Sequence, residues 1–162
     1  MSSSSTSPYL RAAILGTIAG IRSMSAPALV SREAFQSKHD FGGGPLDNLA
    51  SPAVSALLDV AAVGEMVVDK LPFLPNRTDA LPLLGRVILG GSAGAVLFIE
   101  EKQPPIVGAL ISGAAAVVST QISFRLRRAL SKRLPGLLAA LTGDAAVFVL
   151  GRAYLNTGQS ES

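Results

Sequence analysis

The chain has 162 residues, of which 15 % are charged and 49 % hydrophobic, and its formal net charge is +3. Soluble globular domains carry about 25 % charged residues, so this composition argues against a soluble protein. The absence of cysteine excludes a disulfide framework, a thiolate zinc site and a cysteine nucleophile. The basic residues form no patch interleaved with aromatic side chains, and we therefore expect no nucleic-acid partner.

The first apolar segment follows a polar start. Residues 1–8 are rich in serine and show neither a basic segment nor a small-residue cleavage motif, which predicts a flexible N-terminus without a cleaved signal peptide. The apolar segment then runs from about Tyr9 to Leu29. Pro27 should end or kink it, because proline removes an amide donor and clashes with the preceding turn. Arg22 lies close to that expected break, and a polar connection follows.

Four further segments are long enough to cross a membrane as helices, since hydrocarbon about 30 Å thick needs about 20 helical residues. Ser51 suits the N-cap of the second segment and Pro52 its first helical position, and this segment continues to about Lys70. The remaining three run from about Leu81 to Ile99, from Pro104 to Phe124 and from Leu134 to Leu155. The fourth segment carries no charge, so it lacks the polar face that a helix in water needs.

These segments predict an all-α fold, a polytopic transmembrane helical bundle of about five helices. It forms one domain over residues 9–155, followed by a disordered tail over 156–162. Two variants remain open, an inverted internal repeat and a re-entrant or broken helix. The repeat rests on a weak echo of Ser51 to Asp59 in Leu134 to Asp144, which would make the first two segments recur inverted as the last two.

The orientation in the membrane follows from the basic residues beside the segments, which favour the cytoplasmic side. Five crossings put Arg11, Lys70, Arg77 and the basic run after the fourth segment on one side. This predicts a cytoplasmic N-terminus and an external C-terminus. If one segment is re-entrant, the C-terminus moves to the other side.

Small residues recur at the spacing that lets membrane helices approach closely. Gly16 and Gly20 are four residues apart, and so are Gly90 and Gly94. One interpretation is packing within the chain. The other is that one of these faces forms the seam of a homodimer, which is the oligomeric state we expect.

Ionisable residues inside the segments are the strongest functional signal, because a charge in hydrocarbon usually faces protein, water or a partner. The candidate polar pathway consists of Asp59, Glu65, Asp69 and Asp144 as carboxylates, with Arg22 and Arg86 as counter-charges. Glu65 and Asp69 are four apart and share one helix face. A functional interpretation is an ion or proton pathway, and a structural one is ion pairs that fix the helix register.

Two further motifs are polar. Lys70, Arg77 and Thr78 flank a connection with two prolines, which is either a rigid turn or a place where Arg77 and Thr78 cap the next helix or bind a phosphate. The basic run comprises Arg125, Arg127, Arg128, Lys132 and Arg133. It is either a topology signal or a binding site for anionic lipid head groups. No metal site is predicted, and the single histidine, His39, is expected to be solvated in a loop.

Three groups of residues together resemble one family. They are Gly20-Ile21-Arg22-Ser23, then Glu65 with Asp69, Lys70, Pro72, Pro75, Arg77 and Thr78, and then Arg86 with Gly90, Gly91 and Gly94. Over roughly Leu10 to Leu150 the chain resembles the bacterial membrane family called domain of unknown function 4126. The resemblance implies an integral membrane protein, with the bacterial inner membrane as the expected location. It implies no activity.

We expect a channel or transporter for a small ion or solute, without a cofactor. The alternative is a structural or lipid-interacting membrane protein without transport. A membrane enzyme acting on lipid fits less well, because no nucleophile with a matching base is visible, and we expect no enzymatic activity.

Overall fold

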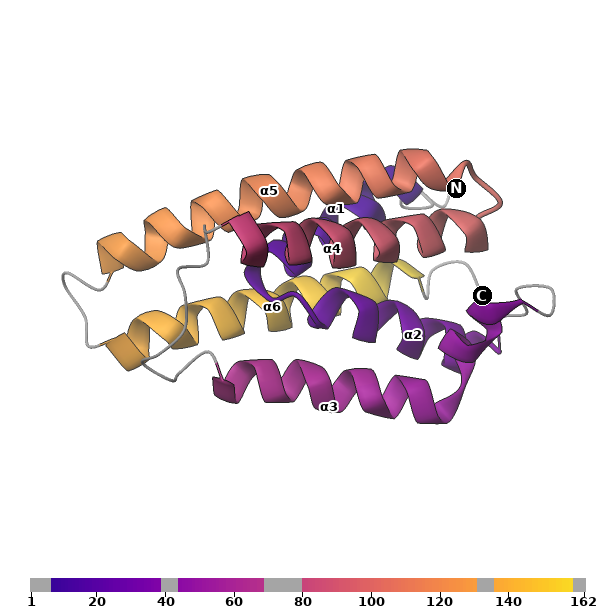
Figure 1. The fold of residues 1–162 in the computed structure, drawn as a ribbon, viewed down its shortest axis with the longest axis horizontal. Helices are drawn as coiled ribbons and strands as arrows, with labels where there is room; N and C mark the ends of the chain where they lie inside the picture. The colour runs from indigo at the N-terminus through magenta and orange to yellow at the C-terminus, as the bar shows by residue number, and fades with distance from the viewer. Residues whose placement is uncertain (1–6, 39–43, 69–79, 131–135, 159–162) are drawn as a thin grey trace, which may run out of the picture.

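The structure is a computed structural model that describes residues 7–38, 44–68, 80–130 and 136–158. Over these residues every regular element is a helix, which confirms the all-α prediction (Figure 1). In chain order the elements are α1 (Pro8–Ile21), α2 (Ser25–Ser37), the 3₁₀ helix η1 (Pro45–Ala50), α3 (Pro52–Val68), α4 (Ala80–Glu100), α5 (Pro105–Leu130) and α6 (Gly136–Gly158).

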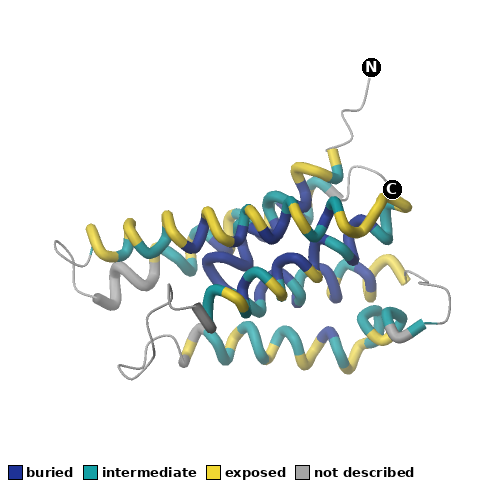
Figure 2. The backbone as a smooth tube through the Cα atoms, turned by 45° about the horizontal axis from the view of Figure 1, so that its top comes forward, coloured by how far each residue is buried: buried dark blue, intermediate teal, exposed yellow. Residues whose placement is uncertain are grey.

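Helix α1 forms the centre of the bundle, because it packs against both α4 and α5, which also pack against each other. Leu15 and Ile18 of α1 are fully buried and share one apolar cluster with Leu97 and Phe98 of α4. Figure 2 shows that the buried residues are concentrated in these inner helices. The outer helices α3 and α6 are mainly half-buried or exposed.

The first apolar segment is two antiparallel helices and not one. Helix α1 ends at Ile21, Arg22 is extended with φ −144° and ψ 118°, and α2 begins at Ser25. Arg11 of α1 forms an ion pair with Glu33 of α2. Both residues lie eleven positions from Arg22, so the chain turns back on itself there. We call α1, the turn and α2 the hairpin.

The break lies before Pro27 for a steric reason. In a continuous helix the ring of Pro27 would meet the carbonyl group four residues earlier, at Ser23, and its missing N–H would leave that carbonyl without a donor. Within the first turn of α2 the same proline is harmless. The prediction of one helix from Tyr9 to Leu29 is therefore wrong, and the bundle has six α-helices over the described residues.

The paired glycines hold α1, α4 and α5 close together. A Cβ atom at Gly16 would overlap the backbone of Ser112 in α5, and one at Gly94 of α4 would overlap the backbone of Gly108. Two hydroxyl groups bond across these contacts, from Ser112 Oγ to the Gly90 oxygen at 2.7 Å and from Thr120 Oγ1 to the Gly20 oxygen at 3.0 Å. These glycine faces are covered by other helices of the same chain, and the expected homodimer stays a prediction.

The outer surface is apolar. Large side chains that stand more than half exposed include Leu57, Val60, Ile106, Leu110, Phe148 and Val149, on helices α3, α5 and α6. By length and composition, α4 from Pro82 to Glu100 and α5 from Pro105 to Leu130 are able to cross a membrane. An apolar surface of this extent suits a helical bundle in contact with lipid.

Because of the hairpin, the residues at each end of the bundle differ from those predicted. Arg11 bonds Glu101, which lies in the turn between α4 and α5, whereas Arg125, Arg127 and Arg128 lie at the far end of the 26-residue helix α5. The prediction that Arg11 shares a side with the basic run is therefore wrong. The start of α1 and the end of α6 lie at the Glu101 end of the bundle (Figure 1), whereas five crossings would place them at opposite ends.

The weak internal echo has no counterpart in the fold. Its first copy would begin with the segment from Tyr9 to Leu29, which is a hairpin with helices of 14 and 13 residues. Its second copy would begin with α5, which is one continuous helix of 26 residues. The two segments are built differently, so the sequence echo does not mark an inverted structural repeat.

Candidate functional site at the hairpin tip

The tip of the hairpin, residues 22–24, lies inside the bundle. Gly20, two residues before it, packs against Ala116 and Ser119 near the middle of α5. Ala19 packs against Gly90 near the middle of α4. Helix α1 has 14 residues and is about 21 Å long, which is too short to cross hydrocarbon about 30 Å thick. The tip therefore stops part-way along the helices around it.

An arginine and an aspartate meet at this tip. Arg22 is buried and forms an ion pair with Asp144, which lies within one turn of the midpoint of α6. The pairing follows from the position of each charge. Arg22 directly follows the C-terminus of α1, where the helix dipole favours a cation, and the carboxylate of Asp144 neutralises it.

A second carboxylate closes the other side of the tip. Glu65, in the last turn of α3, accepts hydrogen bonds from the backbone N–H groups of Ser23 and Met24, each at 2.9 Å. These amides precede α2 and have no partner within that helix. A carboxylate at a helix N-terminus also opposes the positive end of the helix dipole. Glu65 thus acts as an N-cap supplied by a neighbouring helix.

Arg86 lies at the same level on α4. It is buried, and it stands one turn before Gly90, the residue that packs against Ala19 of α1. The structure therefore gathers Arg22, Glu65 and Asp144 at the tip with Arg86 at the same depth. These are four of the six residues that the sequence proposes for a polar pathway.

The other predicted residues lie elsewhere. Asp59 faces Arg32 at 4.0 Å on the surface between α3 and α2, so it does not belong to the tip. Arg125 and Arg128 are exposed and Arg127 half-buried at the end of α5. The remaining predictions fall outside the described residues, and these are Asp69, Lys70, Arg77, Thr78, Lys132 and Arg133.

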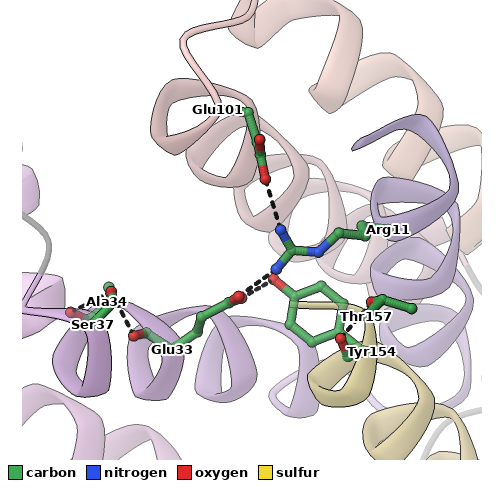
Figure 3. Close-up of polar contacts among 7 residues, drawn as sticks. All are labelled: Arg11, Glu33, Ala34, Ser37, Glu101, Tyr154 and Thr157. Carbon is green, nitrogen blue, oxygen red and sulfur yellow. Dashed lines mark hydrogen bonds and ion pairs between the residues drawn. The ribbon is translucent and has the colours of Figure 1, made fainter. Parts of the chain in front are cut away.

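A second charged cluster, which sequence reasoning missed, holds the open end of the hairpin (Figure 3). Arg11 donates to Glu101 at 2.7 Å and pairs with Glu33, and its guanidinium lies 4.9 Å from the centre of the Tyr154 ring. The Tyr154 hydroxyl donates to Glu33. We call Arg11, Glu33, Glu101 and Tyr154 the anchor cluster. Its only sequence signal is the equal spacing of Arg11 and Glu33 from Arg22, which has meaning once the turn is known.

Most of the chain matches one protein family. A family model described as a domain of unknown function (DUF4126) matches residues 10–155, which extend from α1 to α6. The chain belongs to this family. No curated protein and no solved structure matches it.

The chemistry available to this DUF4126 chain is that of charges in a protein interior. The tip combines two carboxylates, an arginine and the amides of a helix N-terminus, and these groups are able to exchange one ion pair or hydrogen bond for another. Among the described residues no group of three or more His, Cys, Asp or Glu side chains is arranged to hold a metal ion.

Proposed function

We propose that this DUF4126 protein is a multi-pass membrane protein that moves a small ion or solute past the tip of its hairpin. Helices α3 to α6 would cross the bilayer, and the hairpin would enter it from one side and return. The hairpin tip with its charges is the single observation that carries this proposal.

Two physical arguments support it. Backbone that is not helical at membrane depth is tolerated only where protein buries it or where it lines a water-filled cavity. Transporters repeatedly place their sites near the midplane, at the ends of helices that stop part-way. Here α1 ends and α2 begins in mid-bundle, and Arg22, Glu65 and Asp144 gather at these helix ends.

Purified protein in liposomes tests this proposal. Proton and sodium fluxes are followed with trapped dyes sensitive to pH and to Na⁺, in wild type and in Glu65→Gln and Asp144→Asn. We expect a flux above that of empty liposomes, and we expect each substitution to reduce it about tenfold or more, because each removes one charge at the tip. Asp59→Asn is the matched control, because it removes a carboxylate from the same helix as Glu65 but outside the tip.

The result separates the proposal from its alternative. If both tip variants retain the wild-type flux while Asp59→Asn does too, the tip does not carry transport. The absence of any flux would favour a structural role for the tip. The contacts at the tip support that alternative, because Asp144 neutralises Arg22 and Glu65 accepts hydrogen bonds from two amides. In that case Arg22→Ala should chiefly lower the melting temperature in detergent.

The distribution of basic residues supports a topology for this proposal. The basic run at the end of α5 would face the cytoplasm. The N-terminus of α1, the C-terminus of α6 and the anchor cluster would then face outward. This reverses the side that five crossings predict for the N-terminus and keeps the predicted external C-terminus.

The chain has no cysteine, so single cysteines can report on this topology. Ser7→Cys and Ser37→Cys, at the two open ends of the hairpin, should both react with an impermeant maleimide on intact cells, whereas Arg128→Cys should not. Reaction at only one of the two serine positions would mean that the segment between them crosses the membrane.

A further inference from the structure

A groove of about 220 Å³ lies between α3 and α6, with α2 as its floor. Helices α3 and α6 each pack on α2. The groove is lined mainly by apolar groups, among them Leu29 from the floor, Ala62 from α3, and Val147 and Phe148 from α6. Gly151 adds no side chain to the α6 wall. This shape suits an apolar chain lying along the bundle.

One end of the groove carries two arginines. Arg32 of α2 and Arg152 of α6 both line it, together with Asp59 of α3. Arg32 and Asp59 are 4.0 Å apart and about half exposed. Arg152 is exposed, and within the described part of the chain no carboxylate pairs with it. Two guanidinium groups against one carboxylate leave a net positive charge at this end.

These charges lie at the depth where lipid head groups are reached. Arg32 is five residues before the end of α2 and Arg152 is six before the end of α6. At 1.5 Å per residue, both lie within about 10 Å of the end of the bundle. Long arginine side chains cover such a distance while their stems stay on apolar surface. Their planar forks also match the oxygen pairs of a phosphate group.

We propose that this groove binds an anionic phospholipid, with one acyl chain against α2 and the phosphate between Arg32 and Arg152. The positive end selects an anionic head group over a zwitterionic one of equal chain length. The proposal does not depend on transport, because the groove lies outside the tip and uses none of its charges.

Native mass spectrometry of the detergent-purified protein tests the proposal. Phosphatidylglycerol and phosphatidylcholine with the same acyl chains are titrated in parallel, and bound lipid is counted. We expect phosphatidylglycerol to bind about tenfold more tightly, which corresponds to roughly one additional charged hydrogen bond. The double variant Arg32→Gln with Arg152→Gln should lose this preference while it still binds both lipids.

A steric variant and a charge control complete the experiment. Ala62→Phe should fill the groove and reduce binding of both lipids, with the arginines unchanged. Lys102→Asn removes a positive charge from the same end of the bundle but outside the groove, and asparagine tolerates the left-handed backbone there, where φ is 54°. It should retain the preference for phosphatidylglycerol. Melting curves of all variants establish that they are folded.

Three outcomes would overturn the proposal. One is equal binding of the two lipids by the wild-type protein, and another is an unchanged preference in the double arginine variant, which decides the matter even if Ala62→Phe fails to fold. The third is a wild-type dimer that Ala62→Phe converts to a monomer with lipid binding intact. The groove would then be a contact between copies of the chain.

Discussion

The two ends of the hairpin are both held by charges, but they are held in different ways. At the open end one arginine, Arg11, joins α1 to α2, to the turn before α5 and to Tyr154 of α6. At the tip, Arg22 and Glu65 make separate contacts with separate partners. At the open end one residue joins all these contacts, whereas at the tip the Arg22–Asp144 pair and the Glu65 cap share no residue.

The difference indicates which end is able to change. Loss of one contact at the anchor cluster leaves the other groups around Arg11 in place. At the tip, movement of α3 would remove Glu65 from the amides of α2 while Arg22 stayed paired with Asp144. Over the described residues α3 packs mainly on α2 and η1 and lies outside the central group of α1, α4 and α5, so it is held from one side. The open end therefore suits a fixed anchor, and the tip suits a site that opens.

The largest effect should come from Arg11→Ala. Its side chain is only 4 % exposed, and its removal leaves Glu33 and Glu101 without their cation. Removal of one partner from a buried ion pair destabilises a protein by about 3 kcal/mol or more. Chemical unfolding in detergent micelles should show this loss. Arg128→Ala, at an exposed position, should change the free energy of unfolding by about 0.5 kcal/mol or less.

Arg11→Lys sharpens the same comparison. Lysine keeps the charge but lacks the planar fork that reaches two carboxylates at once, so an intermediate loss is expected. If Arg11→Ala is no more harmful than Arg128→Ala, the anchor cluster does not hold the hairpin, and the contrast between its two ends fails.

The next largest effect should come from Gly20→Ala. A Cβ atom there would overlap Ser119 Oγ and the Ala116 oxygen and push the tip away from α5. Overpacking of this kind costs about 1–3 kcal/mol. Gly64→Ala is the matched control, because a Cβ atom at Gly64 meets nothing within 4 Å, and alanine should stabilise α3 by up to about 1 kcal/mol. A gain in unfolding free energy for both variants would contradict the close contact at Gly20.

The sequence predicts the positions of the long helices well and the hairpin poorly. Helices α4 and α6 begin and end within a few residues of the predicted segments, and α5 begins one residue after its prediction. Hydropathy measures the length of an apolar stretch but carries no information on its direction. The segment from Tyr9 to Leu29 is long enough for one crossing, so it is predicted as one. Pro27 does predict a break in this segment. The prediction puts the break at Pro27 itself, whereas the clash acts four residues earlier, at Ser23.

The residues of the candidate site are predictable from the sequence, but their contacts are not. Arg22, Glu65 and Asp144 are predictable, because charges inside apolar segments are costly and must find partners. Their pairing is not predictable, since it depends on how far the hairpin enters the bundle. Arg11 is interpreted from the sequence only as a topology signal, because it is a basic residue near the start of an apolar segment. The contacts of Glu101 and Tyr154 with Arg11 are visible only in the fold.

A smaller effect is expected from Glu65→Gln. Glutamine keeps an oxygen that can accept from Ser23 or Met24 but loses the charge opposite the start of α2. We expect a loss of about 1 kcal/mol. Hydrogen exchange should become faster at the amides of Ser23 and Met24, while exchange in α4 stays unchanged. Unaltered exchange at these two amides would mean that Glu65 does not cap α2.

The smallest effect should come from Asp59→Asn, which tests a charge pair outside both ends of the hairpin. Asp59 and Arg32 are 4.0 Å apart with side chains 42 % and 53 % exposed. Exposed pairs of this kind contribute about 0–1 kcal/mol, and salt screens them. The unfolding free energy should therefore fall by about 0.5 kcal/mol at most, and the difference should vanish in high salt. A loss as large as that of Glu65→Gln would mean that this pair, rather than the tip, holds α3 against the hairpin, and α3 would then be the fixed helix.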